Sequence, residues 1–524
     1  MDYTNGMQST SSLNFVSETT PLLSEASTSS TSSKMPEKNI GISQQTLVSR
    51  GGESVNKARK VPQYVAGLAS TLGALAAGMV LGWTSPAGEN GIELDKQYNI
   101  RIDDEQFAWI GSIFNLGAAA ICVPIGIICD KIGRKKAMLL LTIPFTIGWL
   151  LIIFSSSVKM FYIGRFILGV SGGAFCVTAP MYTAEIAESS IRGTLGSYFQ
   201  LMLTVGILMT YTLGTFMSMR VLSIVSAIVP LVFCAVFIMM PETPVYLLKK
   251  GQINSARSSY RWLRGSTYDI EPEMTAQNEA LAEANRNTIS FLSAIKTKAA
   301  RRGLIIAFGL MTVQQLSGVN AIIFYSGKIF KSAGANMDPN LQTVIVGIMQ
   351  VVAVFISTLI VDRLGRRVLL LVSSAFMCIS AFTMGFYFNL QSNGTDVSSI
   401  SWVPLVAICL FIVLFSIGFG PIPWMMMGEI FSPQIKGIAG SSACLFNWIM
   451  AFFVTKFYSN FESSFGSDRT FWIFSFICAL GFVFVFLIVP ETKGKTLEEI
   501  QCELSGEPIT TTTQNNNSNS NSKM

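Results

Sequence analysis

Twelve apolar segments divide the sequence between residues 62 and 489, and short polar stretches separate most of them. About 20 apolar residues cross the roughly 30 Å of bilayer hydrocarbon as an α-helix. Because lipid offers no partners to backbone amides, such segments are expected to be helical. The sequence therefore predicts an all-α membrane protein with twelve transmembrane helices. The expected spans are 62–84, 106–128, 137–155, 160–182, 195–215, 219–240, 303–327, 341–361, 368–388, 402–427, 438–460 and 470–489.

The composition agrees with a chain embedded in a lipid bilayer. Half of the residues are hydrophobic and 13% are charged, against about 25% in soluble domains. The net charge is +6, but the basic residues stand in short loops at span ends, so no nucleic-acid partner is expected. The nine cysteines are spread singly and there is no histidine. We therefore expect no metal site, no disulfide framework and no cofactor.

Three short motifs occur twice in the same order, once in each half of the chain. In the first motif, Asp130 and Arg134 of the first half correspond to Asp362, Arg363 and Arg366 of the second. In the second motif, Glu185 and Arg192 correspond to Glu429 and Lys436, and in the third Glu242 corresponds to Glu491. Asp130 and Asp362 are 232 residues apart (362 − 130), and Arg134 and Arg366 repeat that offset. Such a duplication predicts two six-helix bundles with a gated pathway between them.

The expected organisation has five parts. A disordered tail (1–60) precedes the first bundle (61–245), a linker with short helices (246–302) joins it to the second bundle (303–489), and a tail (490–524) follows. An even number of spans puts both termini on one side, and the basic loops on that side make it cytoplasmic. Asn393 begins an Asn-Gly-Thr triplet on the predicted outer face, where it is a glycosylation acceptor.

The N-terminal tail contains a possible sorting signal. Glu18, Leu22 and Leu23 have the spacing of an acidic dileucine signal, although a leucine pair in a polar tail can also be incidental. We expect residence in the plasma membrane, with an endosomal or lysosomal membrane as the alternative if this signal is used.

Several further motifs resemble one known family. The sequence has Gly164-Arg-Phe166, Pro241-Glu-Thr-Pro244, Gln314-Gln-Leu-Ser-Gly-Val-Asn320, Gly420-Pro-Ile-Pro-Trp424 and Pro490-Glu-Thr-Lys-Gly494. Together with the repeated loops, these resemble the sugar-porter branch of the major facilitator superfamily over about residues 62–500. Gly82-Trp-Thr-Ser-Pro-Ala87, Trp262-Leu-Arg-Gly265 and Glu271-Pro-Glu273 are most similar to insect facilitated trehalose transporters. The resemblance implies sugar transport by alternating access, and we expect a monomer to carry it out.

The repeated charges are candidates for a latch at the inner side of the pathway. Arg134 with Glu185 or Glu242, and Arg366 with Glu429 or Glu491, can pair across the two bundles while the pathway is open outward. The resemblance gives these positions a gating role. The alternative is that they only set topology, but that role needs no repeated acidic residues. Val245 stands where the family has an arginine, so one member of the latch is missing or replaced.

Uncharged polar side chains within the spans are the candidates for substrate contact. A sugar offers hydroxyl groups and C–H faces, which amides and an indole can bind. The candidates, all at positions that the resemblance associates with sugar, are Gln200, Gln314, Gln315, Asn320, Gln350, Trp424 and Asn447. Amides can also join helices to one another. On a regular helix Gln315 and Asn320 would point about 140° apart, so a break at Gly318 is expected.

Two departures from the family leave the substrate open between trehalose and a hexose such as glucose. Gln350 replaces an expected asparagine, and Ala451 stands where related glucose carriers often have one.

The residues expected for proton coupling are incomplete. In the family, proton-driven porters have an acidic residue in the first span near the arginine of the fourth. Here Arg165 is present, but Val80 occupies the acidic position and the surrounding stretch has neither Asp nor Glu. We therefore expect a facilitative uniporter, with Arg165 in a structural role inside its bundle and counted among the gating residues. The alternatives are a proton-coupled sugar or polyol symporter and, more distantly, a non-transporting sugar sensor.

Two further expectations follow from polar residues in the spans. An enzyme is not expected, because the chain has no histidine and its spans carry no acidic pair. Lys456, in the eleventh segment, is expected to extend its amino group to the outer surface.

Overall fold

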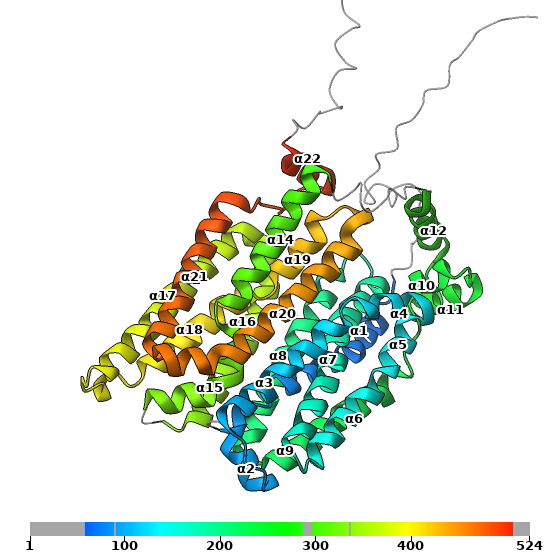
Figure 1. Cartoon of the computed structure of the whole chain (residues 1–524). Helices are drawn as coiled ribbons and strands as arrows, with labels where there is room; N and C mark the ends of the chain where they lie inside the picture. The colour runs from blue at the N-terminus through cyan, green and yellow to red at the C-terminus, as the bar shows by residue number, and fades with distance from the viewer. Residues whose placement is uncertain (1–57, 89–90, 287–295, 335–336, 507–524) are drawn as a thin grey trace, which may run out of the picture. The chain divides into compact units, whose positions relative to one another are not determined.

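The computed structural model of the chain describes residues 58–88, 91–286, 296–334 and 337–506, and every regular element in these ranges is a helix (Figure 1). The proposed sorting residues Glu18, Leu22 and Leu23 lie outside the described residues. The description below concerns the unit formed by residues 56–524.

The N-terminal half forms one bundle, coloured blue to teal in Figure 1. Its elements are α1 (Val61–Gly82), the 3-10 helix η1 (Ser85–Ala87), α2 (Ile92–Tyr98), α3 (Asp104–Ile121), α4 (Pro124–Ile132), α5 (Arg134–Leu140), α6 (Thr142–Ile153), α7 (Val158–Ile186), α8 (Arg192–Phe216) and α9 (Met219–Phe237). Three short helices follow in the linker, namely α10 (Pro244–Lys249), α11 (Ile253–Arg264) and α12 (Glu271–Arg286).

The C-terminal half forms the second bundle, coloured green to orange. It contains α14 (Lys298–Leu316), α15 (Val319–Ala333), α16 (Pro339–Leu364), α17 (Arg366–Ser392), the 3-10 helix η3 (Ser398–Ile400), α18 (Val403–Ile417), α19 (Ile422–Ile430), α20 (Pro433–Phe465) and α21 (Ser467–Ile488). The helix α22 (Leu497–Ser505) lies within the segment expected to be a tail, and Thr496 and Glu499 form a capping box at its start.

Eleven described helical segments are long and apolar enough to span a membrane. The bent pair α3 and α4 makes a twelfth when the two helices count as one span. These segments match the expected spans one to one, so the predicted fold class is confirmed. The 51° bend between α3 and α4 was not expected. Pro124 begins α4, where the lack of an amide hydrogen is tolerated in a first turn but would break a continuous helix.

Glycines bring the helices of the N-terminal bundle into backbone contact. A Cβ on Gly78 or Gly206 would overlap the backbone of α8 or α1, and a Cβ on Gly117 or Gly169 would overlap that of α7 or α3. Transmembrane helices associate by close packing of this kind, because lipid provides no hydrophobic force between them. These contacts hold α1 against α8 and α3 against α7.

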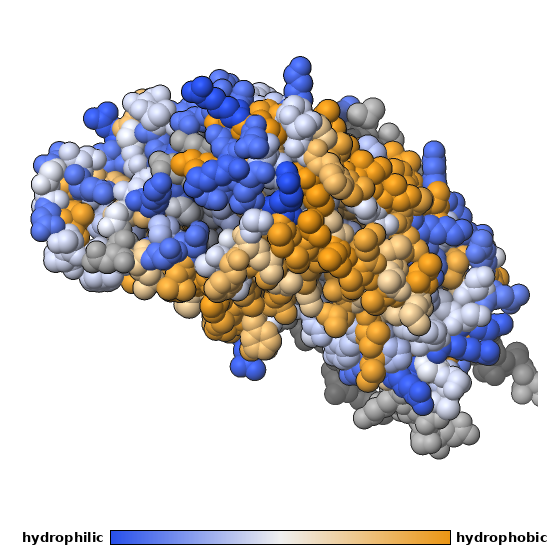
Figure 2. Space-filling model, turned by 90° about the horizontal axis from the view of Figure 1, so that it is seen from below, coloured by the Kyte–Doolittle hydropathy of each residue, from blue (hydrophilic) through white to orange (hydrophobic). Residues whose placement is uncertain are grey.

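Hydrophobic residues gather in a broad band across the surface, with hydrophilic residues to either side (Figure 2). Large exposed side chains such as Ile228, Phe382 and Leu480 lie on spanning helices. In water such a surface would drive aggregation, so the band is the part that contacts lipid.

The two ends of the bundles differ in structure. One end, called here the motif end, has the turns between α4 and α5 and between α16 and α17 together with α10–α12 and α22 (Figure 1). The linker is bonded to the first bundle there, since Arg264 donates to the carbonyl of Ile186 at 2.8 Å and Ser259 donates to that of Glu242 at 2.6 Å. The opposite end has α2, the second half of α15 and the loop after α17.

Candidate functional site

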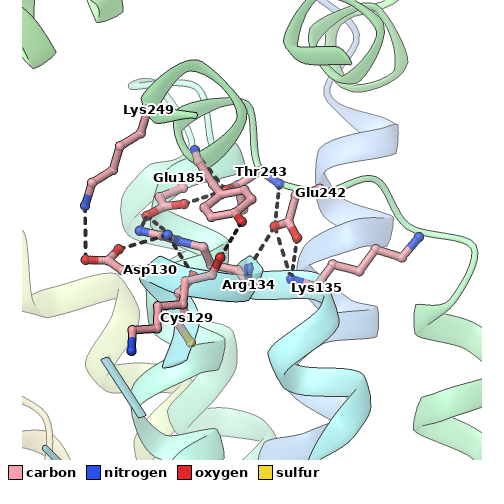
Figure 3. A network of polar contacts seen from close by, with 10 residues as sticks. Cys129, Asp130, Arg134, Lys135, Glu185, Glu242, Thr243 and Lys249 are labelled. Carbon is pink, nitrogen blue, oxygen red and sulfur yellow. Dashed lines mark hydrogen bonds and ion pairs between the residues drawn. The ribbon is translucent and has the colours of Figure 1, made fainter. Parts of the chain in front are cut away.

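A network of charged residues at the motif end joins α4, α5, α7 and the segment after α9 (Figure 3). The Arg134 guanidinium lies 2.9 Å from Glu185 Oε1 and 3.1 Å from Asp130 Oδ1. The Thr243 hydroxyl donates to the other oxygen of Glu185 at 2.6 Å. The Arg134 side chain is 7% exposed, so water screens this pair less than an ordinary surface ion pair. The cluster fixes three helix ends relative to one another.

Glu242 caps a helix instead of pairing with the Arg134 side chain. Its carboxylate accepts from the backbone amides of Arg134 at 3.0 Å and Lys135 at 3.1 Å, which begin α5. A negative charge at a helix N-terminus is favourable because the first amides have no partners within the helix. The preceding Gly133 has φ of +100°, and a Cβ there would overlap Glu242 Oε2. The motif glycine therefore allows both the turn and the approach of the carboxylate.

The second half repeats this arrangement almost atom for atom. Arg366 Nη2 lies 3.0 Å from Glu429 Oε1, and the Thr492 hydroxyl donates to Glu429 Oε2 at 2.6 Å. Glu491 accepts from the backbone amides of Arg366 at 2.9 Å and Arg367 at 3.0 Å, which begin α17. The recurrence of these contacts explains why the three motifs are duplicated together.

The pKa of Glu491 shows how strongly the helix start favours a carboxylate. Burial alone would raise this pKa, but hydrogen bonds from the backbone amides of Lys493, Arg366, Arg367 and Thr492 outweigh burial and lower it. Glu491 is therefore ionised throughout the physiological pH range.

The pairing partners of Arg134 and Arg366 were predicted correctly, but the idea that they pair across the two bundles was wrong. Arg134, Glu185 and Glu242 all belong to the first bundle, while Arg366, Glu429 and Glu491 all belong to the second. Within each cluster a threonine of the same bundle donates to the second oxygen of the bridging glutamate, Thr243 to Glu185 and Thr492 to Glu429.

The remaining gating candidates lie at the same end. Arg192 is exposed at the start of α8, whereas Lys436 in α20 donates to the carbonyl of Gly428 at 2.8 Å. The carbonyl of Arg363 accepts from Lys493. The Asp362 side chain lies outside the described part of the chain.

Lys249 places a cation beside Asp130, whereas Val245, at the position where the family has an arginine, carries no charge. Its Nζ lies 3.0 Å from Asp130 Oδ2, and it stands one helical turn after Val245 on α10. Both partners are about half exposed, so the pair contributes about 0–1 kcal/mol. A cation from the next turn of α10 therefore contacts Asp130, although Val245 itself provides none.

Replacing Gly133 by alanine is expected to destabilise the protein by at least about 2 kcal/mol, because its φ of +100° and ψ of 159° are nearly restricted to glycine. The added methyl group would also displace the Glu242 carboxylate from the start of α5. Thermal unfolding in detergent, followed by fluorescence-detected size exclusion, measures the change.

Gly126→Ala is the matched control for this prediction. Gly126 lies in the same motif, inside α4, and a Cβ there meets nothing within 4 Å. Alanine is the better helix former, so this variant should unfold at the same temperature or higher. Equal stability of Gly133→Ala and Gly126→Ala would contradict the capping role of Glu242.

Four of the candidate amides form one hydrogen-bonded group in the second bundle. Gln315 Nε2 donates to Asn447 Oδ1 at 2.9 Å, and Asn447 Nδ2 donates to Gln314 Oε1 at 2.7 Å. Asn320 Nδ2 donates to Gln315 Oε1. These residues come from α14, α15 and α20, so the group ties three helices together.

Two helix breaks make this group possible. Gly318 has φ of +89° and separates α14 from α15, which turns Asn320 toward Gln315 as the sequence predicted. The second break lies between α18 and α19, where Gln314 Nε2 donates to the carbonyls of Phe419 at 2.7 Å and Gly420 at 3.0 Å. Broken helices at membrane depth expose backbone groups that are tolerated where they line a polar site.

The other substrate candidates do not join this hydrogen-bonded group. Trp424 packs against a buried cluster that includes Met311 and Ala443, which lie one helical turn toward the motif end from Gln315 and Asn447. Gln350 is 3% exposed on α16, and Gln200 is half-buried on α8 in the first bundle.

Trp448 was not among the predicted site residues. It is 9% exposed, packs edge-on against Phe114 of the first bundle at 5.9 Å, and its buried Nε1 has no hydrogen-bond partner in the described residues. An unpaired buried donor is a candidate ligand-binding group, and Trp448 directly follows Asn447 on α20. Its place next to Asn447 in the sequence was the available signal.

Arg165 is fully buried in the first bundle and bonded to backbone carbonyls. Its guanidinium donates to Val80 at 2.7 Å, Ile110 at 2.9 Å and Gly111 at 3.4 Å, and it lies 5.6 Å from the Trp83 ring. Among the described residues no carboxylate pairs with it. Arg165 therefore ties α1 and α3 to α7, in agreement with the expected structural role.

The polar contacts between the two halves that involve described residues lie at the opposite end or at mid-depth. Tyr211 donates to the carbonyl of Ile323 at 2.7 Å, and Asn115 donates to Thr455 at 3.3 Å. Cys122 and Cys444 meet at 3.2 Å near the α3–α4 bend. No described hydrogen bond joins the two motif clusters to each other. The halves are thus held together away from the motif end.

Asn393 ends α17 at the opposite end of the molecule, and its side chain is exposed. This position is accessible from the side expected to be outside.

Comparisons with known proteins agree with this arrangement. The family described as "Sugar (and other) transporter" matches residues 54–504. The facilitated trehalose transporter Tret1 of Culex quinquefasciatus is 38% identical over 449 residues, which are 85% of this chain and 86% of that protein. Tret1 of Anopheles gambiae is 39% identical over 85% of this chain, but the chain spans only 56% of that longer protein.

The solved structures show the fold alone, because their identity is low. The proton:xylose symporter XylE bound to 6-bromo-6-deoxy-D-glucose has a TM-score of 0.71 and 24% identity, covering 85% of this chain and 99% of XylE. Its inward open conformation has a TM-score of 0.69 and 23% identity, covering 84% and 99%. The match over residues 54–504 and the Culex relative confirm the resemblance found in the motifs, and the chain belongs to the sugar transporter family, a family of transporters and not of enzymes.

Proposed function

We propose that this protein is a facilitative transporter of a neutral sugar. The observation that carries the proposal is the hydrogen-bonded group of Gln314, Gln315, Asn320 and Asn447 at two helix breaks. Amides offer both donors and acceptors, as sugar hydroxyl groups require. Gln200 of the first bundle, Gln350 and Trp424 complete the proposed site, in which the Trp424 indole would cover a sugar ring.

The proposed substrate is trehalose or a hexose such as glucose. The relatives from Culex and Anopheles are named as facilitated trehalose transporters, which favours the disaccharide. A site shaped for one glucose ring would bind both trehalose and glucose, because both sugars offer the same pyranose faces.

The transport is proposed to be uncoupled from protons. The Arg165 guanidinium donates hydrogen bonds to the carbonyls of Val80, Ile110 and Gly111. A proton-coupled carrier needs a group that gains and loses a proton during the cycle, but Val80 stands at the acidic position of the first span and no described carboxylate pairs with Arg165. The proton-coupled sugar or polyol symporter is therefore not favoured.

The proposed mechanism is alternating access, in which the two bundles rock about the sugar site. The contacts between Tyr211 and Ile323 and between Asn115 and Thr455 close the opposite end. We therefore propose that the pathway opens toward the motif end, where no hydrogen bond between the described residues joins the two motif clusters. Each motif cluster stabilises its own bundle as a rigid body, so that the bundles move as units.

The topology follows from the loop charges. We propose that the motif end is cytoplasmic, with both termini on that side, and that Asn393 is glycosylated on the outer face. The five-part organisation of the sequence (1–60, 61–245, 246–302, 303–489 and 490–524) is retained, with residence of a monomer in the plasma membrane. An endosomal or lysosomal location depends on Glu18, Leu22 and Leu23.

Uptake by proteoliposomes containing the full chain tests the function. Labelled trehalose and glucose are compared with and without a protonophore. Saturable uptake that the protonophore does not change, and that stops at equal internal and external concentrations, is expected. Accumulation above equilibrium that the protonophore abolishes would establish a symporter instead. Absence of uptake of both sugars by correctly inserted protein would refute the proposal.

A further inference from the structure

Lys456 is a buried cation within the lipid-spanning part of the protein. It lies on α20, nine residues before that helix ends, and its side chain is 5% exposed. A lysine at this depth is costly unless another group compensates its charge. The amino group of Lys456 reaches the exposed Glu105 at the opposite end, but the side chain is buried between the two halves and does not lie on the surface as expected.

The groups that compensate Lys456 belong to the other bundle. Its Nζ lies 4.9 Å from the centroid of the Trp109 ring and 3.5 Å from Glu105 Oε1. Both residues are on α3, four positions apart and so on the same helix face. The contact therefore joins the two halves across the α3–α20 interface.

The other nearby lysine uses partners in its own bundle. Lys328 on α15 pairs with Glu462 at 2.9 Å and donates to Ser459 at 3.2 Å, both on α20. Glu462 is thereby occupied, and Glu105 and Trp109 remain for Lys456. Since Glu105 is 74% exposed, water screens its charge and the indole face contributes most.

The contact depends on the conformation of the two halves. Its neighbours Asn115 and Thr455 also bond across α3 and α20, and Trp109 packs on Phe452 at 5.8 Å. Separation of α3 and α20 at the opposite end would remove the indole and the carboxylate from the amino group together. The contact can therefore exist only while that end is closed.

We propose that Lys456 is a gating residue of the opposite end, where its contact with Trp109 and Glu105 stabilises the closed state of that end. This inference rests on the proposed alternating access. In the open state water hydrates the Lys456 amino group, and this hydration stabilises the open state. This effect is limited because Glu105 keeps the amino group at the edge of water in the closed state as well.

Accessibility of a single introduced cysteine tests the gate without any transport assay. Ser85 is 4% exposed and lies against Gly327 of the other half, so Ser85→Cys reports opening of that end. A membrane-impermeant maleimide is applied from outside to intact cells. The chain without Ser85→Cys, which has only its own nine cysteines, gives the background labelling.

Lys456→Gln in the Ser85→Cys chain is expected to be labelled about tenfold faster, and Trp109→Leu should act in the same direction. Lys456→Arg is the matched control, because a guanidinium keeps both the charge and the stacking, and its labelling should stay slow. Combining Lys456→Gln with Trp109→Leu should add little. Equal or slower labelling of Lys456→Gln would overturn the proposal.

Sugar kinetics separate a failed gate from a failed function. A shift toward the outward-open state makes more of the protein able to bind sugar from outside and less of it able to bind from inside. The concentration of trehalose or glucose needed for half-maximal transport therefore falls for uptake from outside and rises for export from inside. A merely structural defect would lower the maximal rate in both directions. If the unmodified chain carries neither sugar but labelling still responds to Lys456→Gln, the gate stands and the proposed function falls.

Discussion

Replacing Gln315 by alanine is expected to reduce saturable sugar uptake about 100-fold per molecule at the membrane, which is a barrier higher by about 2.7 kcal/mol. Gln315 donates to Asn447 and accepts from Asn320, so its loss leaves Asn447 Oδ1 and Asn320 Nδ2 without a partner, while Asn447 Nδ2 keeps its bond to Gln314. Each unpaired buried polar group costs about 1–3 kcal/mol. Alanine also removes the donor and the acceptor that the sugar would use.

Gln342→Ala is the matched control for Gln315→Ala. Gln342 is a glutamine on α16 that is 1% exposed, and it donates to the carbonyl of Met337 near the opposite end. Its replacement should alter stability but leave uptake per surface molecule within about twofold, because it lies outside the amide group. Surface biotinylation gives the number of molecules and labelled trehalose and glucose give the rate. Normal uptake by Gln315→Ala would show that the sugar binds elsewhere.

The spans could be predicted because lipid imposes a single requirement on every apolar segment. Internal hydrogen bonding and a fixed thickness give helices of known length. The break at Gly318 could also be predicted, since Gln315 and Asn320 cannot share a site on a regular helix. The bend between α3 and α4 was missed because Pro124 lies within a continuous apolar stretch. Nothing local distinguishes a kink there from a helix start.

The motif clusters show what a pattern of charges leaves undetermined. Opposite charges at helix ends indicated that Arg134 and Glu185 pair, and that Arg366 and Glu429 pair. Which bundle supplies each partner depends on tertiary packing. The capping role of Glu242 depends on the φ of Gly133, a backbone angle that many glycine loops can adopt.

In the candidate site, side-chain type was informative but side-chain direction was not. Amides within apolar spans indicated Gln314, Gln315, Asn320 and Asn447, because such groups are costly in lipid without partners. Trp448 was missed since a tryptophan in an apolar span is ordinary, and its unpaired Nε1 is visible only after packing. Lys456 was assigned to the surface because snorkelling is the usual solution for a lysine, whereas a ring on the other bundle provides a different one.

Arg165→Met is expected to lower the stability of the first bundle by roughly 3–5 kcal/mol. A hydrogen bond to a charged group contributes about 1.5–3 kcal/mol, and Arg165 makes such bonds to the carbonyls of Val80, Ile110 and Gly111. Methionine avoids burying a charge, which offsets part of this loss. The carbonyl of Val80 near the end of α1 would also lose its cationic cap. The expected result is a large decrease in surface amount and in the temperature of unfolding in detergent.

Arg165→Lys distinguishes a structural tie from a role in the transport cycle. Lysine keeps the charge but presents its donors from one nitrogen, so it cannot reach all three carbonyls, and stability should fall to an intermediate value. If Arg165 only ties α1 and α3 to α7, the protein that remains should carry sugar at the normal rate per molecule, with and without a protonophore. A variant that folds as well as the parent but no longer transports would contradict this, because the guanidinium would then act during the cycle. A carbonyl cannot take up a proton at physiological pH, so the observed partners of Arg165 leave it no proton to exchange.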